Sequence, residues 1–200
     1  MELHPLILHY SQTTQHDFPL ILVVGREPNN DSISDKKLGC YDFDAPQNRR
    51  CAFWNVAFSI LGKFNGVSTK QIKQELLRRG ASPIIFTDAF PNGIKNSVLN
   101  KRLIRKSQEK DLLEQVSDIF SHKEIIERTK LILLSGLHDE IFCPFKTLVL
   151  EKVKAESHGI EVCCVPFFYP TNTPKITDAL NQKAKILLTE GYSSFMQATA

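Results

Sequence analysis

Hydrophobic residues gather in four short runs along the chain. Each run is rich in Leu or β-branched residues and is bounded by turn residues. Near-continuous apolar runs of this length are typical of strands that are buried on both faces of a parallel sheet. We therefore predict four strands, at Pro19–Gly25, Pro83–Asp88, Lys130–Gly136 and Ile160–Phe168.

Helical patterns fill the intervals between these runs. Residues 52–64 carry apolar side chains three and four positions apart. Residues 68–79 begin with the Ser-x-x-Gln of a capping box and stop before Gly80. Ser121 and Glu124 repeat that start signal. We predict two further amphipathic helices, near 145–157 and 175–190.

Strands that alternate with helices predict a three-layer α/β/α domain with a short, mostly four-stranded parallel sheet. The 200 residues fit one such domain, 1–200, and a hydrophobic fraction of 42% supplies its core. No apolar run is long enough to span a bilayer, and the first residues do not read as a secretory signal. We therefore expect no membrane partner and a location in the cytoplasm or, in a eukaryote, in the nucleus. We also expect a monomer.

The five cysteines include no C-x-x-C pair, so we expect reduced thiols, no metal and no cofactor. Cys163 and Cys164 are neighbours in an apolar run, where a strand would point them to opposite faces. The sequence His138-Asp139-Glu140 allows two interpretations, metal ligands or acids at a helix start. The second is favoured, because adjacent helical positions point in different directions.

Charge is unevenly distributed. The net charge of +3 is too small to indicate nucleic-acid binding by itself. Basic residues nevertheless crowd residues 95–110, where Glu109 is the one acid, and Arg49 and Arg50 form a second cluster. Such clusters are either solvated faces or contacts for phosphates, and both interpretations stay open.

Every predicted strand ends in polar or aromatic residues, and parallel sheets place their sites beyond the carboxyl ends of the strands. Glu27 follows the first strand, and Pro28 disfavours helix at that position. Glu27 is therefore either a rigidly held carboxylate or a solvated turn residue. The chain has no G-x-S-x-G elbow, no G-x-G-x-x-G and no P-loop.

Three segments resemble the uracil-DNA glycosylase superfamily, and in pattern the mismatch-specific uracil/thymine-DNA glycosylase branch most closely. They are Val24-Gly25-Arg26-Glu27-Pro28, the stretch Pro46–Trp54, and Tyr169-Pro170-Thr171-Asn172. The resemblance runs from about Leu20 to Pro174. Glu27 stands where the family has Asp or Asn, Tyr169 stands where it has His or Asn, and three extra residues precede Phe53-Trp54.

The resemblance implies an enzyme that hydrolyses the N-glycosidic bond of uracil or another damaged base in DNA. Glu27 would orient water and offset the positive charge that builds on the sugar, and Tyr169 would share the catalytic role. Phe43 would stack on the extruded base, unless it is simply a core residue. The other residues with implied roles are Asn29, Thr87 and Asp88 for the base, and Arg49, Arg50, Arg102, Arg105, Thr171, Asn172 and Thr173 for DNA. The alternative is a non-catalytic nucleic-acid or nucleotide-binding protein that retains the fold.

Overall fold

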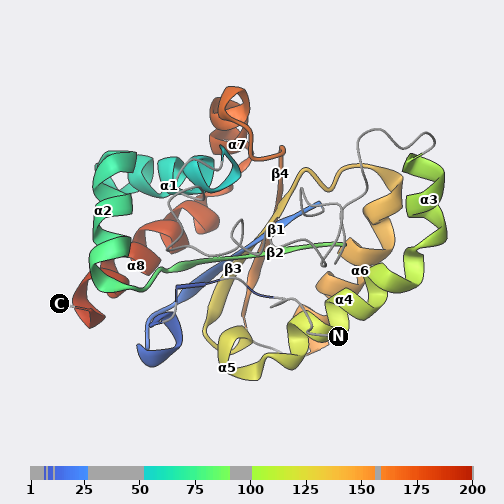
Figure 1. Cartoon of the computed structure of the whole chain (residues 1–200), viewed down its shortest axis with the longest axis horizontal. Helices are drawn as coiled ribbons and strands as arrows, with labels where there is room; N and C mark the ends of the chain where they lie inside the picture. Colours follow the sequence, from blue (N-terminus) through green and yellow to red (C-terminus); the bar gives the residue numbers. More distant parts are fainter. Residues whose placement is uncertain are drawn as a thin grey trace, which may run out of the picture.

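The protein is built around one all-parallel sheet. The computed structural model describes residue 7 and residues 9–10, 12–26, 52–90, 101–155 and 159–199, without the side chains of 101–103. The strands run in the order β2-β1-β3-β4 (Figure 1). Their bounds are Leu20–Gly25 for β1, Ile84–Asp88 for β2, Thr129–Ser135 for β3 and Glu161–Val165 for β4. The predicted four-stranded parallel sheet is confirmed.

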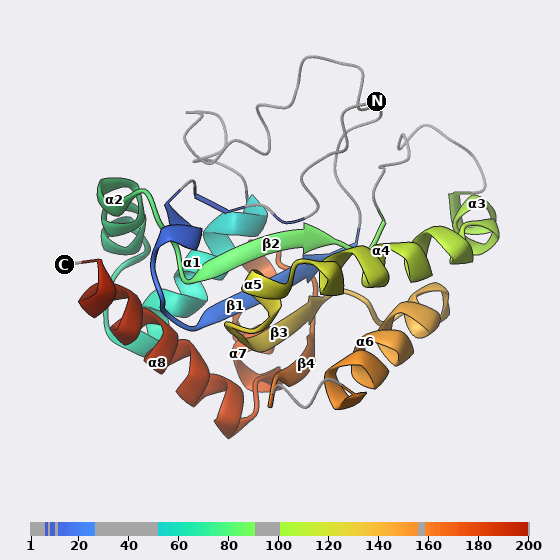
Figure 2. The same ribbon diagram turned by 90° about the horizontal axis from the view of Figure 1, so that it is seen from below.

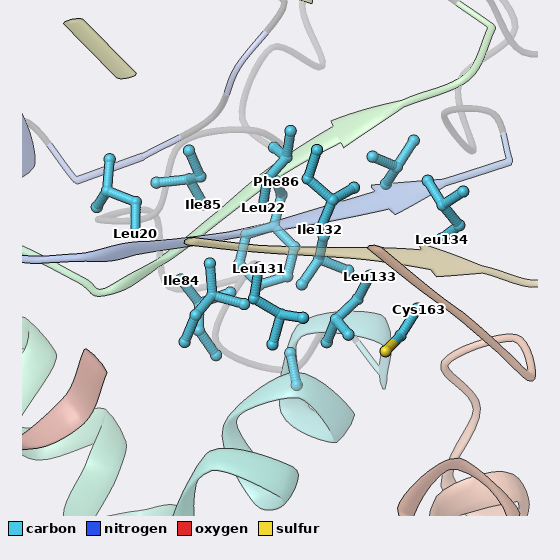
Figure 3. Close-up of a cluster of buried hydrophobic side chains, with 14 of the residues drawn as sticks. Leu20, Leu22, Ile84, Ile85, Phe86, Leu131, Ile132, Leu133, Leu134 and Cys163 are labelled. Carbon is cyan, nitrogen blue, oxygen red and sulfur yellow. The ribbon is translucent and has the colours of Figure 1, made fainter. Parts of the chain in front are cut away.

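The strands are apolar because the sheet is covered on both faces. All six residues of β1 are buried. Ile84, Leu131 and Leu133 point to one face of the sheet, while Ile132 and Leu134 point to the other (Figure 3). The edge strand β4 alternates instead, with Cys163 buried and Cys164 exposed, as the sequence predicted.

Two groups of helices cover the sheet, one on each face (Figures 1 and 2). One face carries α1 (Ala52–Asn65), α2 (Thr69–Arg79), α7 (Thr173–Ala179) and α8 (Gln182–Ala198). The other carries α3 (Lys101–Ser107), α4 (Glu109–Ser121), α5 (Lys123–Ile126) and α6 (Cys143–Ala155). Short 3-10 turns occur at η1 (Thr13–Gln15), η4 (Glu140–Phe142) and η5 (Pro170–Asn172). The structure therefore has the predicted three-layer α/β/α arrangement, and none of its described helices is long and apolar enough to cross a bilayer.

The ends of α2 follow the sequence signals closely. Ser68 Oγ accepts from the Gln71 N–H at 3.2 Å, and Gln71 Oε1 accepts from the Ser68 N–H at 2.9 Å. This is the reciprocal capping box that the sequence predicted. Gly80 ends the helix at a φ of 59°, with its N–H donating to the carbonyl of Leu77.

Two helix predictions need correction. A helix does begin where Ser121 and Glu124 indicated one, because α5 starts at Lys123 with Glu124 in its first turn, but Ser121 does not cap it. Ser121 is instead the last residue of α4, and its hydroxyl donates to the Asp118 carbonyl at 2.6 Å. The apolar stripe of α4 extends that helix as far as Ser121. The single helix predicted near 175–190 is two helices, because Leu180 adopts an extended ψ of 124° and Asn181 then caps α8.

Candidate functional site

The carboxyl edge of the sheet has a topological switch point between β1 and β3. The chain leaves β1 across the α1–α2 face to reach β2, and it leaves β3 across the α6 face to reach β4 (Figure 1). The chain therefore leaves these two neighbouring strands toward opposite faces, and such a switch point is the usual ligand site of sheets of this kind. Arg26 follows β1 at this point, and Gly136 to Asp139 follow β3.

The ends of β1 and β2 are held together past the last strand residues. The Ala89 N–H donates to Gly25 O at 2.9 Å, and the Phe90 N–H donates to Arg26 O at 3.1 Å. A Cβ at Gly25 would collide with the Asp88 carboxylate and force it to move, so glycine serves here for close approach rather than for backbone freedom. The Asp88 carboxylate thus lies directly against the residue that begins the Gly-x-Glu-Pro segment.

The ends of β3 and β4 are joined in the same way. The Gly136 N–H donates to Val165 O at 2.8 Å, and Ser135 Oγ accepts from the Phe168 N–H at 2.9 Å. Asn172 Nδ2 donates to Phe167 O at 3.0 Å. The loop after β4 is therefore a fixed structure rather than an open connection.

Phe53 connects these two pairs of strand ends. Its ring centroid lies 5.7 Å from that of Phe167 and 5.3 Å from that of Phe168, both in the loop after β4. A Cβ placed on Gly25 would lie 3.3 Å from Phe53 Cζ. The Phe-Trp of the sequence motif thus has a packing role, since Trp54 is buried against Phe86, with 5.8 Å between ring centroids.

On the opposite face, two arginines and two phenylalanines form what we call the Arg–Phe row. Arg26 Cζ lies 5.2 Å from the centre of the Phe142 ring, Phe142 lies 5.7 Å from Phe90, and Arg105 Cζ lies 4.0 Å from the centre of Phe90. At its outer end, Arg26 forms an ion pair with Asp139. The row therefore connects residues after β1, β2 and β3 with helix α3.

Arg105 differs from its predicted environment. The sequence suggested a DNA contact, but only 3% of the residue is exposed, and its Nη1 donates to Gln108 Oε1 at 2.8 Å. A guanidinium that is buried over an aromatic ring stabilises the fold and is not accessible to a phosphate of bound DNA. We therefore leave Arg105 out of the proposed DNA contacts.

The remaining predicted site residues fall into three groups. Glu27, Asn29, Phe43, Arg49 and Arg50 lie outside the described residues, and Arg102 belongs to α3 with its side chain undescribed. Thr87 is 3% exposed and belongs to the interior, whereas Asp88 is partly exposed at the sheet edge. The loop after β4 contains Tyr169, which is 54% exposed, the exposed Thr171, and two residues bonded within the loop, Asn172 and Thr173.

The metal interpretation of His138-Asp139-Glu140 finds no support where the structure can test it. In the described parts of the chain, no group of three His, Cys, Asp or Glu side chains is arranged to hold a metal ion. Asp139 pairs with Arg26, and Glu140 begins the η4 turn. The three described cysteines, Cys143, Cys163 and Cys164, are free thiols, and burial raises the pKa of Cys163.

Sequence reasoning missed the Arg–Phe row. It treated Arg26 as the variable position of a motif and did not single out Phe142 or Phe90. Nothing in the local sequence pairs them, since Arg26 and Asp139 are 113 positions apart. The available signal was that Arg26, Phe90 and Phe142 each lie in a segment that follows a predicted strand, whereas nothing pointed to Arg105 in α3 as part of the row.

The chain matches no protein-family model, no curated protein and no solved structure.

Proposed function

We propose that the protein is a DNA glycosylase that hydrolyses the N-glycosidic bond of uracil or another damaged base. The observation that supports this is the position of Phe53, whose ring tip lies where a side chain on Gly25 would meet it and whose ring packs on Phe167 and Phe168 in the loop after β4. Through it, the segment that leads to Glu27 and the loop that carries Tyr169 share one edge of the sheet. These are the two segments to which the sequence resemblance gives catalytic roles.

The proposed chemistry needs few groups. Breaking the bond builds positive charge on the sugar and negative charge on the departing base. The Glu27 carboxylate would offset the first charge and orient the attacking water. The exposed Tyr169 phenol carries an O–H that can donate to an oxygen of the base as it leaves. Asp88, whose carboxylate lies close to Gly25, would read the edge of the base.

The test is a panel of oligonucleotides that each carry one modified base, treated with alkali to cut at abasic sites. On the best substrate, single-turnover base release by Glu27→Gln should fall roughly 10²-fold, the scale of one preorganised electrostatic group, while DNA binding stays intact. Glu151→Gln, on the exposed side of α6, is the matched control and should release base at the wild-type rate. Equal rates for wild type and Glu27→Gln would remove Glu27 from the mechanism.

A second candidate is a nucleic-acid or nucleotide-binding protein without catalysis. The Arg–Phe row favours it, because an exposed guanidinium held at the carboxyl edge of the sheet suits a phosphate and requires no reaction. Oligonucleotide binding without cleavage of any base on the panel would select this candidate.

A further inference from the structure

We propose that Arg26 binds a phosphate of the nucleic-acid strand and that Asp139 holds the Arg26 guanidinium until the phosphate arrives. The inference rests on the proposed function only in taking the ligand to be a nucleic acid. It adds a phosphate-binding residue, and two residues that position it, beside the segment that leads to Glu27.

The location of Arg26 is the first part of the argument. It follows β1 at the switch point, and its main-chain carbonyl is fixed by the Phe90 N–H at 3.1 Å. Its side chain is 40% exposed and that of Asp139 is 54% exposed. A ligand at the carboxyl edge of the sheet can therefore reach the ion pair from solvent.

The ion pair itself can be exchanged at low cost. Pairs between exposed side chains stabilise a fold only weakly, since both charges are well solvated when apart. A phosphate offers the same geometry to a guanidinium as a carboxylate does and can bind it through two parallel hydrogen bonds. Replacing Asp139 by a phosphate thus changes the partner of Arg26 without disturbing the core.

Phe142 supplies the orientation. The Arg26 guanidinium lies over the ring, with Cζ 5.2 Å from its centre. A cation–π contact uses the charge of the guanidinium and leaves N–H donors for hydrogen bonds to other groups. The cation is therefore already oriented before a ligand binds, which lowers the entropy lost on binding.

The inner end of the row holds the Phe142 ring in place. Arg105 is buried over Phe90, and Phe90 packs on Phe142 with 5.7 Å between ring centroids. Phe142 itself is only 2% exposed. The ring under the Arg26 guanidinium is therefore fixed by packing from behind, while Asp139 in front of it is exposed.

The experiment measures the affinity of a labelled, unmodified single-stranded oligonucleotide by fluorescence anisotropy over a series of salt concentrations. Arg26→Ala should weaken binding about fivefold and flatten the log–log salt slope by roughly 0.7 units, the value for one phosphate contact on a single strand. Asp139→Asn should tighten binding about twofold, because a competing carboxylate is removed. Phe142→Leu should weaken binding less than Arg26→Ala does, because Arg26 loses its platform but keeps its charge.

The matched control is Arg78→Ala. Arg78 is also an exposed arginine paired with a carboxylate, since its Nη2 lies 2.8 Å from Glu75 Oε2. It lies at the C-terminal end of α2, just before β2 begins, and so at the amino edge of the sheet, away from Arg26. Its replacement should leave affinity and slope unchanged. Thermal unfolding of each variant shows whether it folds, and if Arg26→Ala does not, Asp139→Asn decides the question.

Several results would overturn the proposal. They are an unchanged slope in Arg26→Ala, weaker binding by Asp139→Asn, or no oligonucleotide binding by the wild type. The base-release panel separates this proposal from the proposed function. If the wild type releases base but Arg26→Ala keeps the full salt slope, only the phosphate contact is refuted. If Arg26→Ala reduces the slope but the wild type releases no base, only the proposed catalysis is refuted.

Discussion

Replacing Gly136 by alanine should destabilise the protein in two separable ways. Gly136 has a φ of +72°, and an L-residue in the left-handed region costs roughly 1 kcal/mol. The new Cβ would also lie 2.8 Å from Phe167 Cβ and 3.1 Å from Phe167 Cα. Phe167 cannot easily withdraw, since its carbonyl accepts from Asn172 Nδ2. Overpacking of this kind costs about 1–3 kcal/mol, so the expected total loss is about 2–4 kcal/mol.

Gly66→Ala is the matched control for this prediction. Gly66 has a φ of +67°, and a Cβ there would meet nothing within 4 Å. The Gly66→Ala variant should therefore lose only the stability that the left-handed backbone conformation costs, roughly 1 kcal/mol. Urea denaturation followed by circular dichroism measures both losses, and the slope of free energy against urea should be the same for both variants. Equal losses would show that Phe167 moves freely and that the loop after β4 is not fixed as described.

Three further predictions concern stability and thiol reactivity. Arg128→Met should cost about 2–3 kcal/mol in urea denaturation, because the guanidinium donates to the carbonyls of Thr13 and Phe18 and its loss leaves both unsatisfied. Hydrogen bonds, chiefly from Arg78 and secondly from Arg79, hold the pKa of Glu75 below its ordinary value of 4.5. The ionised Glu75 carboxylate therefore contributes stability above pH 4.5, and this stability is lost as the pH falls through the lowered pKa. Glu75→Gln should flatten the acid limb of the curve of stability against pH, and an unchanged limb would contradict this. Burial raises the pKa of Cys163, so a thiol reagent at pH 8 should label the exposed cysteines in the native protein and Cys163 only after unfolding, as peptide mapping can check.

The strands were predictable because burial on both faces imposes a continuous apolar run. The prediction overran at β4, where the apolar run continues to Phe168 but the strand ends at Val165. Pro166 follows Val165 and has no N–H for the ladder, and the N–H of Phe168 goes to the Ser135 hydroxyl. Apolar patterning could not reveal a change of hydrogen-bond partner.

The location of the candidate site was predictable, but its contacts were not. Parallel topology brings all carboxyl ends of strands to one edge, so the loops after the strands could be grouped from sequence. Whether Arg26 meets Asp139 depends on β1 and β3 being neighbours, which is set by strand order and by packing across the whole domain. The burial of Arg105 is a similar case, because a run of basic residues does not show which of them the fold turns inward.

The strand order also bears on how the chain acquires its structure. Of the strands that the structure describes, β1 is the first to leave the ribosome. It pairs with β2 on one side and with β3, about a hundred residues later, on the other. Until β3 emerges, one edge of an entirely apolar strand has no partner within the sheet, and such edges promote association between chains. We therefore expect slow folding for this domain, and nascent or truncated chains that end before Thr129 should aggregate rather than form a smaller stable core.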